Sequence, residues 1–232
     1  MLTLRKAEDR GKSDLGWLTS YHTFSFGDYY DPAQMGFRSL RVINEDRVAP
    51  GGGFGMHGHR DMEIVTLVLS GALEHKDSLG HGEVLRPGEL QHMSAGSGIR
   101  HSEFNPSATE TTHLYQIWLL PRAKGLEPSY HQQKFDPANR AGRWQLVASP
   151  GGIEGSLPIE QDAKIYLADL PAGGKLDFEL AANRHAWLQV LRGAVELNGH
   201  ALSTSDAAAT TNESALTVQA TQPAELLLFE LA

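Results

Sequence analysis

The feature that most constrains the fold of this chain is a succession of short β-rich segments separated by glycine, proline and asparagine. Helical periodicity is hard to find between them. Segments rich in branched apolar and aromatic residues, spaced in this way, are typical of the strands of a barrel or sandwich. The sequence therefore predicts an all-β fold. The expected strands cover residues 39–43, 63–69, 71–75, 113–120, 164–170, 186–197 and 224–231.

One hairpin turn can be assigned from its residues alone. Asn198 and Gly199 lie between two β-rich runs, in "ELNGHA" at 196–201. Both central residues of a type I′ turn need a positive φ, which asparagine and glycine adopt readily. We expect a tight hairpin at this position.

The chain also carries a weak internal repeat. Gly71 aligns with Gly193 in one pair of similar segments, and Glu89 aligns with Asp206 in a second pair. Two similar β-modules in tandem explain this pattern. The aligned segments are "LVLSGALEH" (67–75) with "QVLRGAVEL" (189–197), and "PGELQHMSAGSGIRHSE" (87–103) with "TSDAAATTNESALTVQA" (204–220).

The boundary between the two modules is expected in a loop-rich stretch. In "QLVASPGGIEGSLPIEQD", residues 145–162, glycine, proline and serine interrupt the strand pattern. We therefore predict an N-terminal domain over residues 1–145 and a C-terminal domain over residues 146–232.

Composition and charge exclude several classes of partner and site. The formal net charge is −8 and no run of Lys and Arg occurs, so direct binding to nucleic acid or to an anionic membrane is not expected. The chain has no cysteine, so any metal must be held by nitrogen and oxygen atoms. The first residues, "MLTLRKAEDRGKSDLGW", contain no apolar signal segment, and no stretch is long enough to span a membrane. We expect a cytoplasmic protein.

Two short motifs each space two possible metal ligands by one residue. They are "MHGHR", with His57 and His59, and "GIRHSEF", with His101 and Glu103. Residues i and i+2 of a strand point to the same face, so each pair would share a face. If two strands bring these faces together inside a barrel, three imidazoles and one carboxylate converge. This donor set suits Fe, Mn, Ni, Cu or Zn and leaves coordination positions open, as catalytic sites do.

The other histidines have no partner at comparable spacing, and we expect each to lie on the surface or to be satisfied by hydrogen bonds. His113 lies on an aromatic strand and is a candidate for lining a pocket. Tyr115 and Trp118 are interpreted as core residues, although aromatic walls would also suit a flat phenolic ligand. The remaining histidines are His22, His75, His81, His92, His131, His185 and His200.

Several longer motifs resemble a known family. The segment "GGGFGMHGHRDME", from Gly51 to Glu63, is similar to the first metal-binding motif of the cupin superfamily. Three further segments resemble the pirin branch of that superfamily, in particular bacterial pirin-like quercetin 2,3-dioxygenases. The resemblance is strongest over residues 16–121. The three segments are "HTFSFGDYYDP" (22–32), "GFRSLRVINED" (36–46) and "LRPGELQHMSAGSGIRHSEF" (85–104).

This resemblance implies a bicupin, two antiparallel β-barrels of the jelly-roll type in tandem, with one divalent transition metal in the N-terminal barrel. Iron is the expected metal, as Fe(II), with Mn, Ni, Co, Cu or Zn as alternatives. The general cupin pattern makes Glu63 a ligand, whereas the pirin pattern assigns that role to Glu103. Strand parity does not choose between the two. We take the pirin set as the prediction and expect Glu63 to hold an imidazole nearby. The predicted ligands are His57, His59, His101 and Glu103.

The internal repeat argues for a single metal site. When the two modules are aligned, the four predicted ligands fall on residues that do not form a metal site. The second module is therefore expected to have an architectural role. The aligned residues are Glu179, Ala181, Val218 and Ala220.

The family resemblance implies a metal-dependent dioxygenase that cleaves a flavonol such as quercetin, or a related phenolic compound, with O₂ and releases carbon monoxide. Glu103 is the expected catalytic base. The alternative is a metal- and redox-sensing regulatory protein that acts through a protein partner. A third possibility is that flavonol cleavage accompanies a reaction on another substrate.

Overall fold

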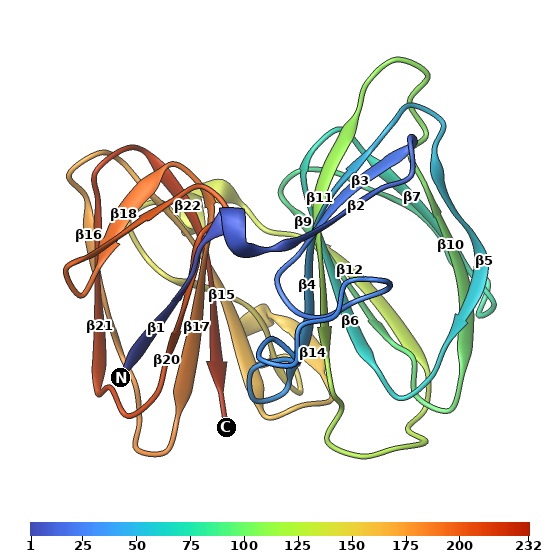
Figure 1. Ribbon diagram of the computed structural model, residues 1–232. Helices are drawn as coiled ribbons and strands as arrows, with labels where there is room; N and C mark the ends of the chain where they lie inside the picture. The colour runs from blue at the N-terminus through green and yellow to red at the C-terminus, as the bar shows by residue number, and fades with distance from the viewer. The chain divides into compact units, whose positions relative to one another are not determined.

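The computed structural model describes residues 1–232 and confirms the all-β prediction. The chain forms twenty-two strands and three short 3₁₀ helices. Its helices are all too short to cross a membrane. The strands form two compact units (Figure 1). We call residues 11–135 with 157–161 the N-terminal barrel, and residues 1–10, 136–156 and 162–232 the C-terminal barrel.

The N-terminal barrel consists of two antiparallel sheets that face each other (Figure 1). The larger sheet has the order β12-β9-β6-β11-β4-β3-β2, and the smaller has the order β5-β10-β7-β8. Its strands, with β14 (Leu157–Ile159), are β2 (Gly11–Asp14), β3 (Leu18–His22), β4 (Leu40–Val48), β5 (Gly53–His59), β6 (Glu63–Ser70), β7 (Leu73–Asp77), β8 (Gly82–Leu85), β9 (Glu89–Ser94), β10 (Ile99–Phe104), β11 (Thr112–Leu119) and β12 (Ser129–Lys134).

Strand alternation decides which side chains enter this barrel. On β11, Leu114 belongs to the apolar core of the barrel, and Gln116 and Trp118 follow on the same face. On β4, Asn44, Asp46 and Val48 share the inward face in the same way. Polar residues therefore line part of the interior, between an apolar cluster around Val48 and Leu114 and the smaller sheet.

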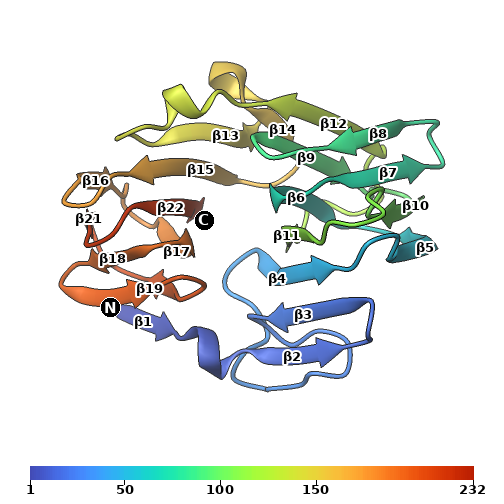
Figure 2. The same cartoon turned by 90° about the horizontal axis from the view of Figure 1, so that it is seen from above.

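The C-terminal barrel repeats this arrangement. Its strands run β1-β20-β17-β22-β15-β13 in one sheet and β16-β21-β18-β19 in the other. Figure 2 labels all of these strands except β20. Its elements are β1 (Leu2–Arg5), the 3₁₀ helix η1 (Ala7–Asp9), η2 (Pro137–Asn139), β13 (Gln145–Pro150), η3 (Ile153–Gly155), β15 (Ala163–Leu170), β16 (Lys175–Glu179), β17 (His185–Arg192), β18 (Ala194–Leu197), β19 (His200–Ser203), β20 (Ala207–Thr210), β21 (Ala215–Ala220) and β22 (Ala224–Leu231).

The repeat read from the sequence corresponds to this shared topology. The order β9-β6-β11-β4 of one barrel matches β20-β17-β22-β15 of the other, and β5-β10-β7-β8 matches β16-β21-β18-β19. Gly71 follows β6 and Gly193 follows β17, both with positive φ, 78° and 83°. A Cβ at either position would overlap neighbouring backbone, so both turns require glycine. The Asn198-Gly199 hairpin is also confirmed, with φ of 48° and 81° between β18 and β19.

The two compact units are not divided by a single boundary in the sequence, because each contains more than one chain segment. The first strand pairs with β20, Leu2 opposite Thr210, so residues 1–10 belong to the C-terminal barrel. Lys6 and Asp206 join the two ends by an ion pair of 2.5 Å. The division into 1–145 and 146–232 stays a prediction about domains.

The interior of the C-terminal barrel is apolar at the strand positions that carry polar residues in the N-terminal barrel. Leu216, Val218 and Ala220 of β21 are buried in a single hydrophobic cluster. These residues occupy the strand equivalent to β10, which carries His101 and Glu103. Both clusters of possible metal ligands lie in the N-terminal barrel.

Candidate metal centre and pocket

Strands β5 and β10 bring the two sequence motifs together. His57 lies directly opposite His101 in the ladder, and their Nε2 atoms are 3.0 Å apart. The ring of His59 lies 4.8 Å from each of the other two rings, centroid to centroid. One nitrogen from each of the three imidazoles lies within 4.8 Å of the others. The expectation that His57 and His59 share a face is therefore confirmed.

A β-bulge and a glycine shape this meeting of strands. The register shifts between His101 and Glu103, so that Glu103 lies opposite Phe54. Such a shift re-aims side chains and is frequent beside functional sites. A Cβ at Gly53 would overlap the backbone carbonyl of Glu103. The glycine run before the first histidine pair therefore allows β5 to approach β10 closely at Glu103.

Two of the three histidines, His59 and His101, are held in the neutral form that binds metals. Burial, and then the charge of His57, lower the pKa of His59 to about 4. Burial, followed by the neighbouring histidines, lowers the pKa of His101 to about 2. Neutral imidazoles present a lone pair, so a metal binds them without displacing a proton from these two rings. Three ring nitrogens that lie within 4.8 Å of one another fit a divalent transition metal.

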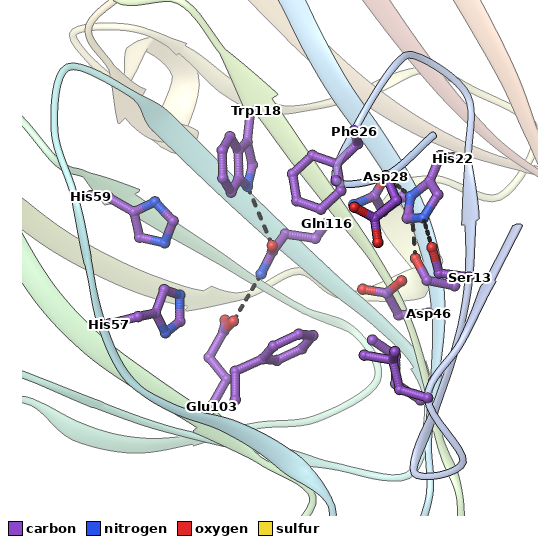
Figure 3. Close-up of a pocket in the computed structure, with 16 residues that line it drawn as sticks. Ser13, His22, Phe26, Asp28, Asp46, His57, His59, Glu103, Gln116 and Trp118 are labelled. Carbon is purple, nitrogen blue, oxygen red and sulfur yellow. Dashed lines mark hydrogen bonds between the residues drawn. The ribbon is translucent and has the colours of Figure 1, made fainter. Parts of the chain in front are cut away.

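Glu103 adds a carboxylate with one unused oxygen. Gln116 Nε2 donates to Glu103 Oε2 at 2.9 Å, and Trp118 Nε1 donates to Gln116 Oε1 at 3.3 Å (Figure 3). The other oxygen, Oε1, is buried and has no hydrogen-bond partner. Burial raises the pKa of Glu103 to about 7. A buried, unpartnered carboxylate oxygen is costly, and it is the group that a metal or a substrate proton would satisfy.

The ligand atom of Glu103 belongs to a second cluster. It lies within 4.8 Å of ligand atoms of His75 and His101, whereas the first cluster consists of His57, His59 and His101. His101 is common to both clusters. Glu103 also lines the same cavity as His57 and His59.

A hydrogen-bonded chain behind His101 was missed by the sequence analysis. Asp77 Oδ2 accepts from His75 Nε2 at 3.1 Å, so His75 Nδ1 is an acceptor. That atom receives Gln91 Nε2 at 3.1 Å and faces His101 Nδ1 at 3.5 Å. His101 Nδ1 therefore carries the proton, and its Nε2 lone pair faces His57. The motif "HKD", His75 to Asp77, was the available signal, because its ends share a strand face.

Glu63 lies away from the histidine cluster. Glu63 and Val68 are five residues apart on β6, so their side chains point to opposite faces of the strand. Val68 belongs to the apolar core of the barrel, and Glu63 therefore points away from that core. Its carboxylate accepts from His92 Nε2 and Ser94 Oγ, both at 2.7 Å, and from the Glu160 backbone at 3.0 Å. The imidazole that Glu63 holds is thus that of His92, which is outside both clusters.

The cluster opens onto a cavity of about 330 Å³, within the usual size of small-molecule sites. Phe26, Phe54 and Trp118 supply aromatic walls, so the alternative interpretation of Trp118 as a pocket wall is correct. His113 does not line this cavity, because alternation puts it on the other face of β11; its Nε2 bonds Glu45 at 2.9 Å, which confirms the expectation of a hydrogen-bonded histidine. The lining residues are Ser13, Leu15, Leu18, Ser20, His22, Phe26, Gly27, Asp28, Asn44, Asp46, Phe54, His57, His59, Glu103, Gln116 and Trp118.

A second polar group lines the cavity away from the histidine cluster (Figure 3). His22 contacts Ser13 Oγ through Nε2 at 2.8 Å and Asn44 Oδ1 through Nδ1 at 2.9 Å. Ser20 donates to the Asp46 carboxylate, and burial raises the pKa of Asp46 to about 6. His22 was expected to be satisfied by hydrogen bonds, which is confirmed. Its place in the cavity was missed.

Two antiparallel barrels with a histidine cluster in one of them define a protein of the bicupin class. The Pirin family profile matches residues 3–119, and a quercetinase C-terminal cupin domain matches residues 146–231. This chain belongs to the pirin family.

Relatives of known name or structure match the whole chain. Quercetin 2,3-dioxygenase of Escherichia coli strain K12 is 50% identical over 231 residues, covering 100% of this chain and 99% of the relative. A pirin-like protein of Caulobacter vibrioides is 42% identical and covers 98% and 99%. The crystal structure of the Escherichia coli bacterial pirin YhhW in complex with nickel(II) has a TM-score of 0.95 at 49% identity, covering 100% and 99%.

Proposed function

We propose that this protein is a metal-dependent dioxygenase that cleaves a flavonol such as quercetin and releases carbon monoxide. One observation carries the proposal: two histidines of the metal-ligand cluster, His57 and His59, line a single cavity with aromatic walls together with Glu103, which has an unpartnered carboxylate oxygen. The name of the Escherichia coli relative, quercetin 2,3-dioxygenase, supports the same reaction.

The ligands that we propose for one divalent metal are His57, His59, His101 and Glu103. Three imidazoles and a carboxylate suit Fe(II), which is our first candidate, with Mn, Ni, Co, Cu and Zn as alternatives. The nickel(II) complex of the related pirin supports a divalent ion in this family. When bound, the metal supplies Lewis acidity and the means to bring O₂ and substrate into reaction.

The protein side chains orient the substrate and move one proton. Phe26 and Trp118 pack edge to face with ring centroids 5.4 Å apart, and together they would form one aromatic wall against the flat ring system and shield it from water. Glu103 Oε1 would accept the proton of the flavonol 3-hydroxyl, while Gln116 keeps Oε2 in place. The heterocycle then opens, carbon 3 leaves as carbon monoxide, and both atoms of O₂ remain in the ester product.

The test is a turnover assay on protein loaded separately with each candidate metal. The moles of O₂ consumed, of quercetin lost (followed by its absorbance) and of carbon monoxide trapped should be equal. Unchanged quercetin under every metal loading would contradict the proposal. Metal-dependent co-purification of a protein partner without turnover would instead support the regulatory alternative.

A further inference from the structure

We infer that the polar end of the cavity away from the histidine cluster is a recognition subsite for a phenolic hydroxyl, and that Asp46 accepts the hydrogen bond from that hydroxyl. The inference rests on the proposed function and names the part of the substrate that this end selects. The hydroxyl belongs to the pendant ring of a flavonol, the ring attached beside the carbon that carries the reacting 3-hydroxyl.

The state of Asp46 is the first argument. Its side chain points inward from β4 and is 4% exposed. Ser20 donates to the carboxylate, but Oδ1 is buried and has no hydrogen-bond partner. A buried carboxylate oxygen without a donor is unfavourable by itself. Asp46 is therefore an acceptor to which the cavity can present a donor.

The polar neighbours of Asp46 are engaged with one another. His22 uses both ring nitrogens, one on Ser13 and the other on Asn44. These contacts hold the rim of the subsite in place without satisfying Asp46 Oδ1. The missing donor is best supplied by the molecule that occupies the cavity.

Charge limits the chemistry of that molecule. The lining contains the carboxylates of Asp28, Asp46 and Glu103 and no lysine or arginine. A substrate carboxylate at this end would meet like charge without a counter-ion, whereas a neutral hydroxyl donates without that penalty. The subsite therefore favours hydroxylated aromatic rings over aromatic acids.

The position of Asp46 relative to Glu103 assigns the ring. Asp46 is close enough for its charge to act on Glu103, the proposed acceptor of the 3-hydroxyl proton. Figure 3 shows Glu103 and Gln116 between two groups: His57 and His59 on one side, and Ser13, His22 and Asp46 on the other. The pendant ring is the substituent next to the 3-hydroxyl, so it extends toward Asp46.

The experiment measures binding separately from turnover, under nitrogen, by quenching of tryptophan fluorescence. Three flavonols share the 3-hydroxyl and 4-carbonyl and carry two, one or no pendant-ring hydroxyls: quercetin, kaempferol and galangin. Wild-type protein should bind quercetin about 10-fold or more tightly than galangin, the usual effect of a hydrogen bond to a charged group. In Asp46→Ala the ratio should fall to about one, with galangin binding retained as proof that the cavity is folded. Asp14→Asn, an exposed carboxylate outside the cavity, is the matched control.

The outcomes separate this inference from the proposed function. An unchanged quercetin-to-galangin ratio in Asp46→Ala overturns the subsite. An equal loss of affinity for all three flavonols overturns its assignment to the pendant ring. If wild-type protein binds none of them, the proposed function fails and the subsite with it. If it binds them with the expected ratio but does not turn them over, the subsite stands and the proposed reaction fails.

Discussion

At the scale of single residues, hydrogen-bond direction distinguishes groups that look alike in the sequence. Glu63 and Glu103 are both buried carboxylates near histidine motifs. Glu63 has its acceptor capacity used by His92, Ser94 and a backbone amide, whereas Glu103 keeps one oxygen free. Only the second arrangement leaves an atom available for chemistry.

Glu103→Gln should therefore lower flavonol turnover by about 100-fold or more, because the variant keeps its shape but loses the proton acceptor. Metal content should fall less than turnover. Glu63→Gln should leave turnover within about 10-fold of wild type while lowering thermal stability, because its partners are then partly unsatisfied. Both variants are assayed at the same metal loading. Full activity of Glu103→Gln together with an empty site in Glu63→Gln would favour the general cupin ligand set.

Asp77 does not contact the histidine cluster directly; it holds His75, which in turn faces His101. Asp77→Asn removes the charge that fixes the proton on His75 Nε2, and so weakens the control over the tautomer of His101. Changes of this kind cost roughly 10- to 100-fold in metal affinity. Titration of the apoprotein with Co(II), followed by absorption, gives the dissociation constant directly. An unchanged constant with an unchanged Co(II) spectrum would show that the chain behind His101 has no such role.

At the scale of elements, the sequence predicts that the segments are β-strands. It predicts only in part where the strands end and which side chains meet. The run at 186–197 was expected as one strand and is two, β17 and β18, because Gly193 turns the chain with a φ of 83°. Alternation placed His57 with His59, since that rule acts within one strand. It did not predict the neighbours of β10, because the pairing with β7 that brings His75 beside His101 is long-range.

Gly53→Ala tests the close approach of β5 to β10. The added methyl group meets the backbone at Glu103, so β5 must move away from β10 at the bulge. We expect metal affinity and turnover to fall by at least about 10-fold, with the fold retained, because misplacing a catalytic group by an ångström has effects of this size. Gly55→Ala is the control, since a Cβ there has no atom within 4 Å. Equal behaviour of the two variants would contradict this account.

At the scale of the whole molecule, the tandem repeat and the all-β fold were readable in the sequence, because glycine turns and apolar strands leave local patterns. The sequence did not reveal that residues 1–10 belong to the C-terminal barrel, because the pairing of β1 with β20 joins segments that are far apart in the chain. The apolar interior of the C-terminal barrel follows from Val218 and Ala220, and these positions were identified from the repeat.

The link between the chain ends makes the C-terminal barrel sensitive to acid. Burial disfavours the charged Asp206, but hydrogen bonds from Lys6, Ser203 and Ala7 outweigh it and hold the pKa of Asp206 below its usual value. A lowered pKa stabilises the fold above the ordinary aspartate pKa of about 3.9, and that stability is lost as the pH falls through the folded value. Asp206→Asn should cost about 1–2 kcal/mol at pH ~7, allowing for the partly exposed lysine, and much less at pH ~3. Urea unfolding at both pH values checks this, and an equal loss at both would refute the charge-based explanation.

The central claim is that one metal in the N-terminal barrel, held by the histidine cluster, is required for flavonol cleavage. The most direct measurement is the rate of carbon monoxide release as apoprotein is titrated with Fe(II), for wild type and for His57→Ala and His101→Ala. We predict that the wild-type rate rises linearly and reaches its maximum at about one metal per chain, as a single open catalytic site requires. The variants should keep their β circular dichroism and lose most metal and activity. Carbon monoxide release that is independent of metal occupancy, or a maximum reached only with a second metal bound in the C-terminal barrel, would contradict the claim.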